Sequence, residues 1–277
     1  MRIVAAVIVL AIAAPASAGE RFALVVTGAA GGAEYAGKYD TLRASFVAVL
    51  RDTFKYEADH ILVLAETDGS GVEKATRENA RRVLGDLRRR LTKDDQLLVL
   101  LIGHGTTPDG EDAKFNLVGP DLSAGEWADL LKPISGRLVF VNTTSASFPF
   151  LKKIAGRGRV VLTATDSAVQ QFETVFPEFF VKAFEDPAAD ADKSGRVSIW
   201  EAFVYASAAV KQYFDQKGQL PTERPLLDDT GGGIGREALV PGADGALARV
   251  TYLEPEAALT LPADSALAAL VRSQAEL

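Results

Sequence analysis

The sequence predicts an α/β fold in which a mostly parallel sheet is covered by helices on both faces. Short apolar runs of strand length alternate along the chain with segments whose apolar residues recur at helical spacing. The runs are nearly continuous, as in residues 97–102, and such runs are typical of strands buried on both faces. Because strands that alternate with helices usually build parallel sheets, the expected architecture is a three-layer sandwich.

The first 18 residues are set apart from this fold. Arg2 precedes an apolar stretch at 3–14, and small residues follow up to Ala18, which is the pattern of a secretory signal peptide. The apolar stretch is well short of the roughly 20 residues that a membrane-spanning helix needs. We therefore expect an exported protein, periplasmic or secreted, with no membrane association after signal cleavage.

Composition narrows the classes of function. The formal net charge is −7 at pH 7, so the chain is a poor candidate for binding nucleic acid. The sequence contains no cysteine, which excludes disulfides, thiolate metal sites and a cysteine nucleophile. An oxygen-ligated ion remains compatible with the composition.

The elements of the first half follow one another as strand and helix. Residues 22–27 predict a first strand, and the glycine-rich loop at 28–32 predicts a turn into a helix at about 39–54. The loop lacks the spacing of dinucleotide-binding and P-loop motifs, which leaves phosphate binding as the weaker alternative. A second strand is expected at 60–64, and a second helix opens at Thr76 with an apolar face and an arginine-rich face.

The next predicted strand carries the main candidate for chemistry. It is an apolar run from Gln96 to Ile102 that ends in Gly103, His104 and Gly105. Ligands of open α/β sheets bind outside the carboxyl ends of the strands. A titratable side chain at such an end, between two glycines that let another chain come close, is a candidate catalytic residue.

The remaining elements continue the same alternation. The sequence predicts a small hairpin near 115–118, a short helix opened by the capping-box pattern of Ser123 and Glu126, and strands at 138–141 and 159–163.

A cluster of hydroxyl side chains stands at the end of the strand that follows His104 in the predicted sheet. It includes Thr144 and Ser145, and Ser145 is far enough along the chain for a helix and a strand to return beside the first. A histidine within hydrogen-bond reach of a hydroxyl is the minimum for base-assisted nucleophilic attack, and backbone N–H groups at Gly105 and Ser145 would form an oxyanion hole. Asp166, after the next strand, is a candidate third member, although such an aspartate more often caps a turn.

These motifs resemble the legumain and caspase-like peptidase fold, over a stretch from about Arg21 to about Ala209. In that family a His-Gly pair at one strand end supplies the catalytic base, and the next strand end carries a nucleophilic cysteine. His104 and Gly105 match the first motif. Ser145 stands at the cysteine position, and a shift of one residue would place Thr144 there instead.

The departures from the family decide the expected activity. Without cysteine, a cysteine peptidase is excluded, and Ala29, Ala30 and Ala36 stand where legumain-type enzymes carry substrate-recognition groups. The leading hypothesis is a non-catalytic pseudopeptidase that binds a peptide or protein. The alternatives are a serine-dependent hydrolase, in which Ser145 attacks and His104 moves the proton, and a purely structural protein.

A second motif, at residues 190–201, resembles the calcium loop of an EF-hand. Glycine stands at loop position 6, an apolar residue stands at position 8, and the pattern of an amphipathic helix follows. The ligands expected for structural calcium, in loop order, are Asp190, Asp192, Ser194, the carbonyl of Arg196, Ser198 and Glu201. The plainer alternative is a solvated acidic loop that caps the helix. The segment near 221–232 resembles a second acidic segment of bacterial legumain-like proteins, but Gly232 departs from it.

The predicted organisation has three parts. A signal peptide at 1–18 is followed by the caspase/legumain-like domain at 19–235 and by a C-terminal extension at 236–277. Within the extension, Arg249 to Leu253 predicts an additional edge strand, and the alanine-rich remainder predicts a packed or frayed tail.

Overall fold

A computed structural model describes residues 19–108 and 112–255 of the 277-residue chain. The expected signal peptide at 1–18 and the alanine-rich part of the extension, 256–277, lie outside the described residues. No helix in the described part of the chain is long and apolar enough to span a membrane.

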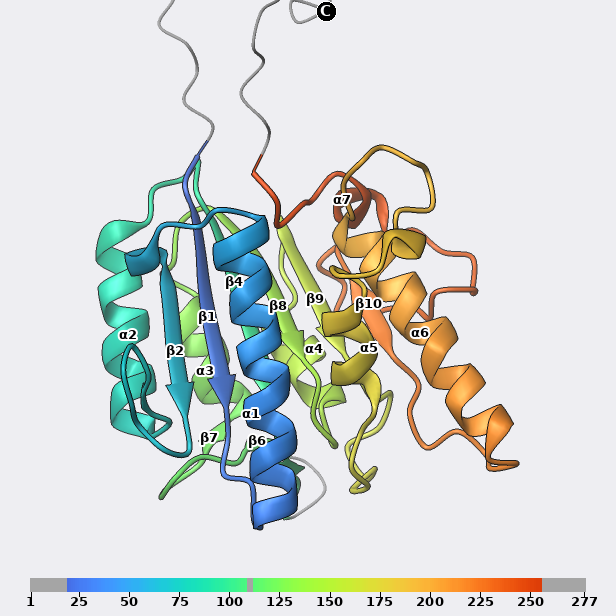
Figure 1. The fold of residues 1–277 in the computed structure, drawn as a ribbon, viewed down its shortest axis with the longest axis horizontal. Coiled ribbons are helices and arrows are strands. Elements are labelled where there is room, and N and C mark those ends of the chain that lie inside the picture. The colour runs from blue at the N-terminus through green and yellow to red at the C-terminus, as the bar shows by residue number, and fades with distance from the viewer. Residues whose placement is uncertain (1–18, 109–111, 256–277) are drawn as a thin grey trace, which may run out of the picture.

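The centre of the molecule is a seven-stranded sheet, shown in Figure 1, with the strand order β10-β9-β8-β4-β1-β2-β3. Its strands are β1 (Arg21–Thr27), β2 (Ile61–Ala65), β3 (Glu73–Lys74), β4 (Gln96–Ile102), β8 (Arg137–Asn142), β9 (Arg159–Thr163) and β10 (Leu226–Asp228). All neighbouring strands are parallel except β9 and β10, which are antiparallel. A separate small antiparallel sheet consists of β5 (Gly105–Thr106), β6 (Lys114–Phe115) and β7 (Leu122–Ser123).

Helices cover both faces of the large sheet (Figure 1). The α-helices are α1 (Ala33–Ala48), α2 (Arg77–Arg90), α3 (Ala124–Leu131), α4 (Phe148–Ile154), α5 (Phe176–Lys182), α6 (Ile199–Gln216) and α7 (Ala246–Arg249). A π-helical turn, Val49–Thr53, extends α1, and single 3-10 turns stand at Ala58–His60 and Pro187–Ala189. The predicted fold class, a three-layer α/β sandwich with a mostly parallel sheet, is confirmed.

The continuous apolar run of β4 follows from its place between two cores. Leu98, Leu100 and Ile102 face the core that contains residues of α1, α5 and α6. The alternate residues of the strand face the core that contains residues of α2, α3 and α4. Because successive side chains of a strand point to opposite faces, burial on both faces requires an apolar residue at every position.

Local sequence signals explain where several helices begin. The capping box predicted for Ser123 and Glu126 is present, and a second one joins Ser198 and Glu201 at the start of α6. Thr76 accepts a hydrogen bond from the backbone N–H of Asn79 and caps α2.

The edge strand predicted at Arg249 to Leu253 is wrong. Arg249 ends the short helix α7, and Tyr252 forms only an isolated bridge to Ser198. The side chain of Asp229 accepts hydrogen bonds from the N–H groups of Gly245 and Ala248, at 2.7 and 2.8 Å, and so stabilises the N-terminal turn of α7. The sheet edge is formed by β10 instead.

Candidate strand-end site

The topology places His104 and Ser145 at adjacent strand ends. β4 pairs in parallel with β8, and His104 follows β4 while Ser145 follows β8. The backbone around Gly105 touches that of Ser145, because a Cβ atom at Gly105 would lie 2.2 Å from the Ser145 carbonyl oxygen. The approach of these two segments was predicted from the order of strands.

The hydroxyl of Ser145 is bound to the peptide group of Gly105. Ser145 Oγ donates to the Gly105 carbonyl oxygen at 3.0 Å and accepts from the Gly105 N–H at 3.3 Å. Ser145 is 3% exposed. Among the described residues, no hydrogen bond joins Ser145 Oγ to the His104 ring. In this arrangement the Gly105 N–H, expected to stabilise an oxyanion, binds the serine itself.

The imidazole of His104 has other partners. Its Nε2 lies 3.0 Å from the carbonyl oxygen of Ala30, which can only accept, so we assign the proton to Nε2. The Tyr39 hydroxyl lies 3.2 Å from Nε2 and 3.5 Å from Nδ1. Burial raises the pKa of Tyr39, so the phenol is neutral at physiological pH. The Tyr35 ring also packs edge-to-face with the imidazole, with the ring centroids 4.9 Å apart.

The other hydroxyl side chains at the end of β8 are buried and hydrogen-bonded. Thr144 Oγ1 contacts Asn142 Oδ1 at 2.8 Å and the Ser145 carbonyl at 3.0 Å. Ser147 Oγ bonds Thr165 Oγ1 at 3.0 Å, next to β9. Thr144 therefore bonds within its own segment, whereas Ser147 joins the end of β8 to the end of β9.

The candidate third member is not linked to the histidine. Asp166 Oδ2 instead accepts a hydrogen bond from Arg224 Nη1 at 3.0 Å, and Arg224 also pairs with Glu237. A Ser-His-Asp arrangement therefore does not form among these residues in the structure.

A ten-residue segment contacts the residues that follow β8, and sequence reasoning missed it. This segment, residues 166–175, is here called the strap; it runs between β9 and α5 without helix or strand. The carbonyl oxygen of Gln170 in the strap accepts from the N–H of Ala146 at 2.8 Å. The strap exposes two large apolar side chains, Val169 and Phe172, at 73% and 69%.

A buried glutamate holds the far end of the strap, and it was also missed. Glu223 is 2% exposed and accepts from the N–H groups of Val175 and Phe176 at 2.8 and 2.9 Å. Burial raises its pKa to about 7, against the opposing effect of these hydrogen bonds. Its position between two prolines, at 221 and 225, gives a turn signal but no signal of burial.

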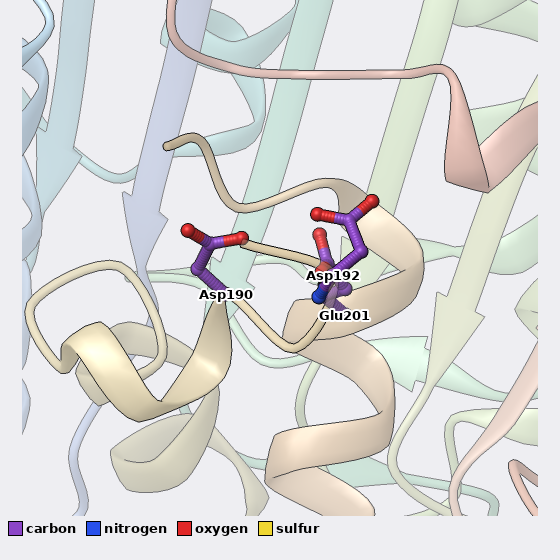
Figure 2. Close-up of side chains that lie close together, drawn as sticks. All are labelled: Asp190, Asp192 and Glu201. Atoms are coloured by element: carbon purple, nitrogen blue, oxygen red, sulfur yellow. Dashed lines mark hydrogen bonds between the residues drawn. The ribbon is translucent and has the colours of Figure 1, made fainter. Parts of the chain in front are cut away.

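The expected calcium ligands gather at the start of α6 (Figure 2). One carboxylate oxygen from each of Asp190, Asp192 and Glu201 lies within 4.8 Å of the others. Glu201 is 8% exposed, and its Oε1 accepts from the N–H groups of Ala191 and Asp192. Hydrogen bonds from the backbone and side chain of Ser194 lower the pKa of Asp192.

The other three expected ligands lie in the same loop. Ser194 Oγ donates to the carbonyl oxygen of Arg196 at 2.9 Å, so the oxygens expected at loop positions 5 and 7 are neighbours. Ser198 Oγ donates to Glu201 Oε2 at 2.8 Å in the capping box. All six expected donors are oxygens, which suits a hard divalent cation such as calcium.

Two apolar grooves flank α6, and neither is lined by His104 or Ser145. One, of about 360 Å³, lies between α6 and the segments around Pro221 and Leu239. The other, of about 430 Å³, runs past Trp200 toward the acidic loop. They share Val204 and Ala208 on α6.

Comparisons with known proteins show the fold of this chain but not its family. No protein-family model matches the sequence, and no curated protein resembles it in sequence. Protein GSU0716 from Geobacter sulfurreducens has a similar structure, with a TM-score of 0.50 and 12% identity over 76% of this chain and 92% of that one. The Drosophila initiator caspase Dronc superposes with a TM-score of 0.48 and 12% identity over 79% of this chain and 81% of the caspase. The similarity to protein GSU0716 is thus a similarity of fold at low sequence identity.

Proposed function

We propose that this chain is an exported, caspase- and legumain-like pseudopeptidase that binds a peptide or protein without cleaving it. The His-Gly motif at His104 and the strand-end position of Ser145 support the peptidase relationship, and the signal-like residues 1–18 support export. The net charge of −7 argues against nucleic acid as the partner.

One observation carries the non-catalytic assignment. A serine nucleophile needs a base within hydrogen-bond reach, but the Ser145 hydroxyl donates to the Gly105 carbonyl and is 3% exposed. The chain has no cysteine to take the same position. What remains accessible is the partly exposed His104 with the aromatic ring of Tyr35 beside it.

The binding test uses the mature chain, residues 19–277, and a phage-displayed library of random octapeptides. Enriched peptides are resynthesised with a fluorophore and titrated by anisotropy. We expect His104→Ala to weaken binding at least tenfold. His60→Ala is the matched control, because the sequence has two histidines and His60 stacks on Phe22, next to the start of β1. Failure to enrich any peptide, or equal losses in both variants, would remove support for this proposal.

The rival function is a serine-dependent hydrolase built on Ser145 and His104. The adjacency of the two strand ends is the observation in its favour, because catalytic hydrogen bonds can tighten only once substrate binds. A fluorophosphonate probe distinguishes the two proposals. We expect no labelling of the mature protein; labelling that is lost in both Ser145→Ala and His104→Ala would establish the hydrolase.

We further propose that the loop at 190–201 binds calcium and stabilises the fold. The oxygen donors from loop positions 1, 3 and 12 already lie together, and glycine at position 6 has the positive φ of 87° that the sharp turn of an EF-hand loop requires. Asp190, Asp192 and Glu201 would supply the charge, and Ser194, Arg196 and Ser198 would complete the oxygen shell. The chemistry supplied by the ion is neutralisation of three clustered carboxylates.

Thermal unfolding in calcium and in chelator tests this site. We expect calcium to raise the Tm by several degrees through preferential binding to the folded chain, and Glu201→Gln to abolish the rise. Glu126→Gln is the matched control, because Glu126 occupies the same place in the capping box of α3. Equal Tm values for the wild type in both conditions would exclude a stabilising site.

A further inference from the structure

The strap is hydrogen-bonded to the strand end that carries Ser145. Its Gln170 carbonyl binds the N–H of Ala146, and the hydroxyl of Thr174 donates to the carbonyl of Thr143. Ala146 has a positive φ of 51°, an uncommon conformation for a residue with a side chain. The residues on either side of Ser145 are therefore fixed by the strap.

The end of the strap is held by the side chains of Glu223 and Lys38. Glu223 accepts both N–H groups at the start of α5, those of Val175 and Phe176. Lys38 of α1 binds Glu173 in the strap and Glu178 in α5, both at 2.7 Å. The Lys38 pairs are partly exposed and contribute little, whereas the hydrogen bonds to Glu223 are buried and costly to leave unmade, so Glu223 is the stronger determinant of closure.

We propose that the strap is an autoinhibitory cover over the strand-end site and that Glu223 is the latch that sets how often it opens. The inference rests on the proposed peptide-binding function, because it assigns the regulation of that same site. Opening separates residues 166–175 from β8 and exposes the segment around Ser145 to a ligand.

The direction of the pH dependence follows from the burial of Glu223. The charged groups around it come from α1, α5, α6, its own segment and the segment that follows β10: Lys38, Glu178, Lys211, Arg224 and Glu237. Burial raises the pKa of Glu223 to about 7 from its ordinary value of 4.5, and nearby Glu178 acts in the same sense, whereas Lys38 opposes it. The closed state therefore binds the proton more tightly than an open state in which Glu223 is solvated. Closure is favoured at acid pH and is progressively lost as the pH rises from about 4.5 to about 7.

Amide hydrogen exchange measures the latch directly. The two amides that Glu223 binds, on Val175 and Phe176, are followed in the mature chain between pH 5 and 8, and their rates are divided by the intrinsic rate at each pH. We expect protection to fall by up to about tenfold per pH unit below pH 7 and to level off above it. Glu223→Gln should make protection independent of pH.

Glu237→Gln is the matched control for the loss of a nearby carboxylate. Glu237 pairs with Arg224, beside Glu223, but does not bind the strap amides. We expect it to retain the wild-type pH profile. A pH-independent profile in the wild type, or an unchanged slope in Glu223→Gln, would overturn the latch.

Two further measurements test the titration of Glu223 and the pH dependence of peptide binding. If Glu223→Gln does not fold, carboxyl NMR of the wild type gives the titration midpoint of Glu223, which must coincide with the midpoint of the protection change; separate midpoints would overturn the latch.

The selected octapeptides should bind more tightly at pH 7.5 than at pH 5. Binding that is equal at both values would refute autoinhibition and leave the proposed function standing, whereas a pH-dependent strap without any peptide binding would refute the proposed function alone.

Discussion

The glycine that follows His104 should be required for stability, and its replacement by alanine tests the packing of the strand ends. A Cβ atom at Gly105 would lie 2.2 Å from the Ser145 carbonyl oxygen and 2.7 Å from Thr144 Oγ1. An ordinary contact between carbon and oxygen is about 3.3 Å or longer, so the backbone at Ser145 would have to move by about 1 Å.

The expected cost has two components. Overpacking of a buried position costs about 1–3 kcal/mol. The displacement also breaks the two hydrogen bonds between Gly105 and Ser145, at 3.0 and 3.3 Å, and each contributes about 1 kcal/mol. Gly105→Ala should therefore lower the free energy of unfolding by about 3–5 kcal/mol.

Gly85→Ala is the matched substitution, and we expect it to change the free energy of unfolding in the opposite direction. Gly85 lies inside α2, and a Cβ atom there would meet only the end of the Arg89 side chain, at 3.9 Å. Gly85→Ala should raise the free energy of unfolding by about 0.5–1 kcal/mol, because alanine loses less conformational entropy in a helix.

Urea denaturation followed by far-UV circular dichroism measures both variants. The midpoints should move in opposite directions, and the slope of the unfolding free energy against urea concentration should stay unchanged. A Gly105→Ala variant as stable as the wild type would refute the reasoning, because it would show that the segments after β4 and β8 are not in close contact.

Three further substitutions test the core, a helix cap and the buried glutamate. Phe46→Ala empties a fully buried position of α1 and should cost about 3–5 kcal/mol in urea unfolding; a cost below 1 kcal/mol would contradict its place in the core. Thr76→Ala removes the bond to the Asn79 N–H and should cost about 1 kcal/mol, whereas Thr76→Asp should retain the cap. Between pH 4.5 and 7 the wild type should lose up to about 3 kcal/mol relative to Glu223→Gln, since a carboxyl with a raised pKa in the folded state stabilises the fold when protonated; parallel pH profiles would exclude this.

The fold was predictable where burial produces a recognisable pattern of apolar residues in the sequence. The run 97–102 of β4 is apolar at every position because both faces of the strand are covered, and this pattern predicted a buried strand. The capping box of Ser123 was predictable because its two hydrogen bonds join residues three positions apart.

The spacing of three residues between Ser198 and Glu201 is ambiguous. Ser198 and Glu201 occupy positions 9 and 12 of the expected calcium loop and also form a capping box. Both interpretations use the same serine and glutamate spacing, so sequence alone does not separate them. The convergence of Asp190 and Asp192 on Glu201 is the additional information that the structure supplies.

Long-range contacts explain what the sequence did not predict. Asp229 caps α7 from a distant position in the chain, and Glu223 caps α5 although it lies well beyond the end of that helix. Neither pairing has a local spacing rule. The adjacency of the segments that carry His104 and Ser145 was predictable, because it follows from the order of the strands. The binding of the Ser145 hydroxyl to Gly105 was not predictable, because no local spacing rule describes it.

The strand order has a consequence for how the sheet assembles. β2 is added to one side of β1 and β4 to the other, after which β8, β9 and β10 are each added outside the previous strand in chain order. A chain that folds from its N-terminus would extend the sheet outward, and each new edge would be apolar until the next strand covers it. Until Leu226–Asp228 is in place, the exposed edge is Arg159–Thr163, with a central run of valine, valine and leucine. The three residues of β10 thus cover an edge that would otherwise pair with the same strand of another incompletely folded chain.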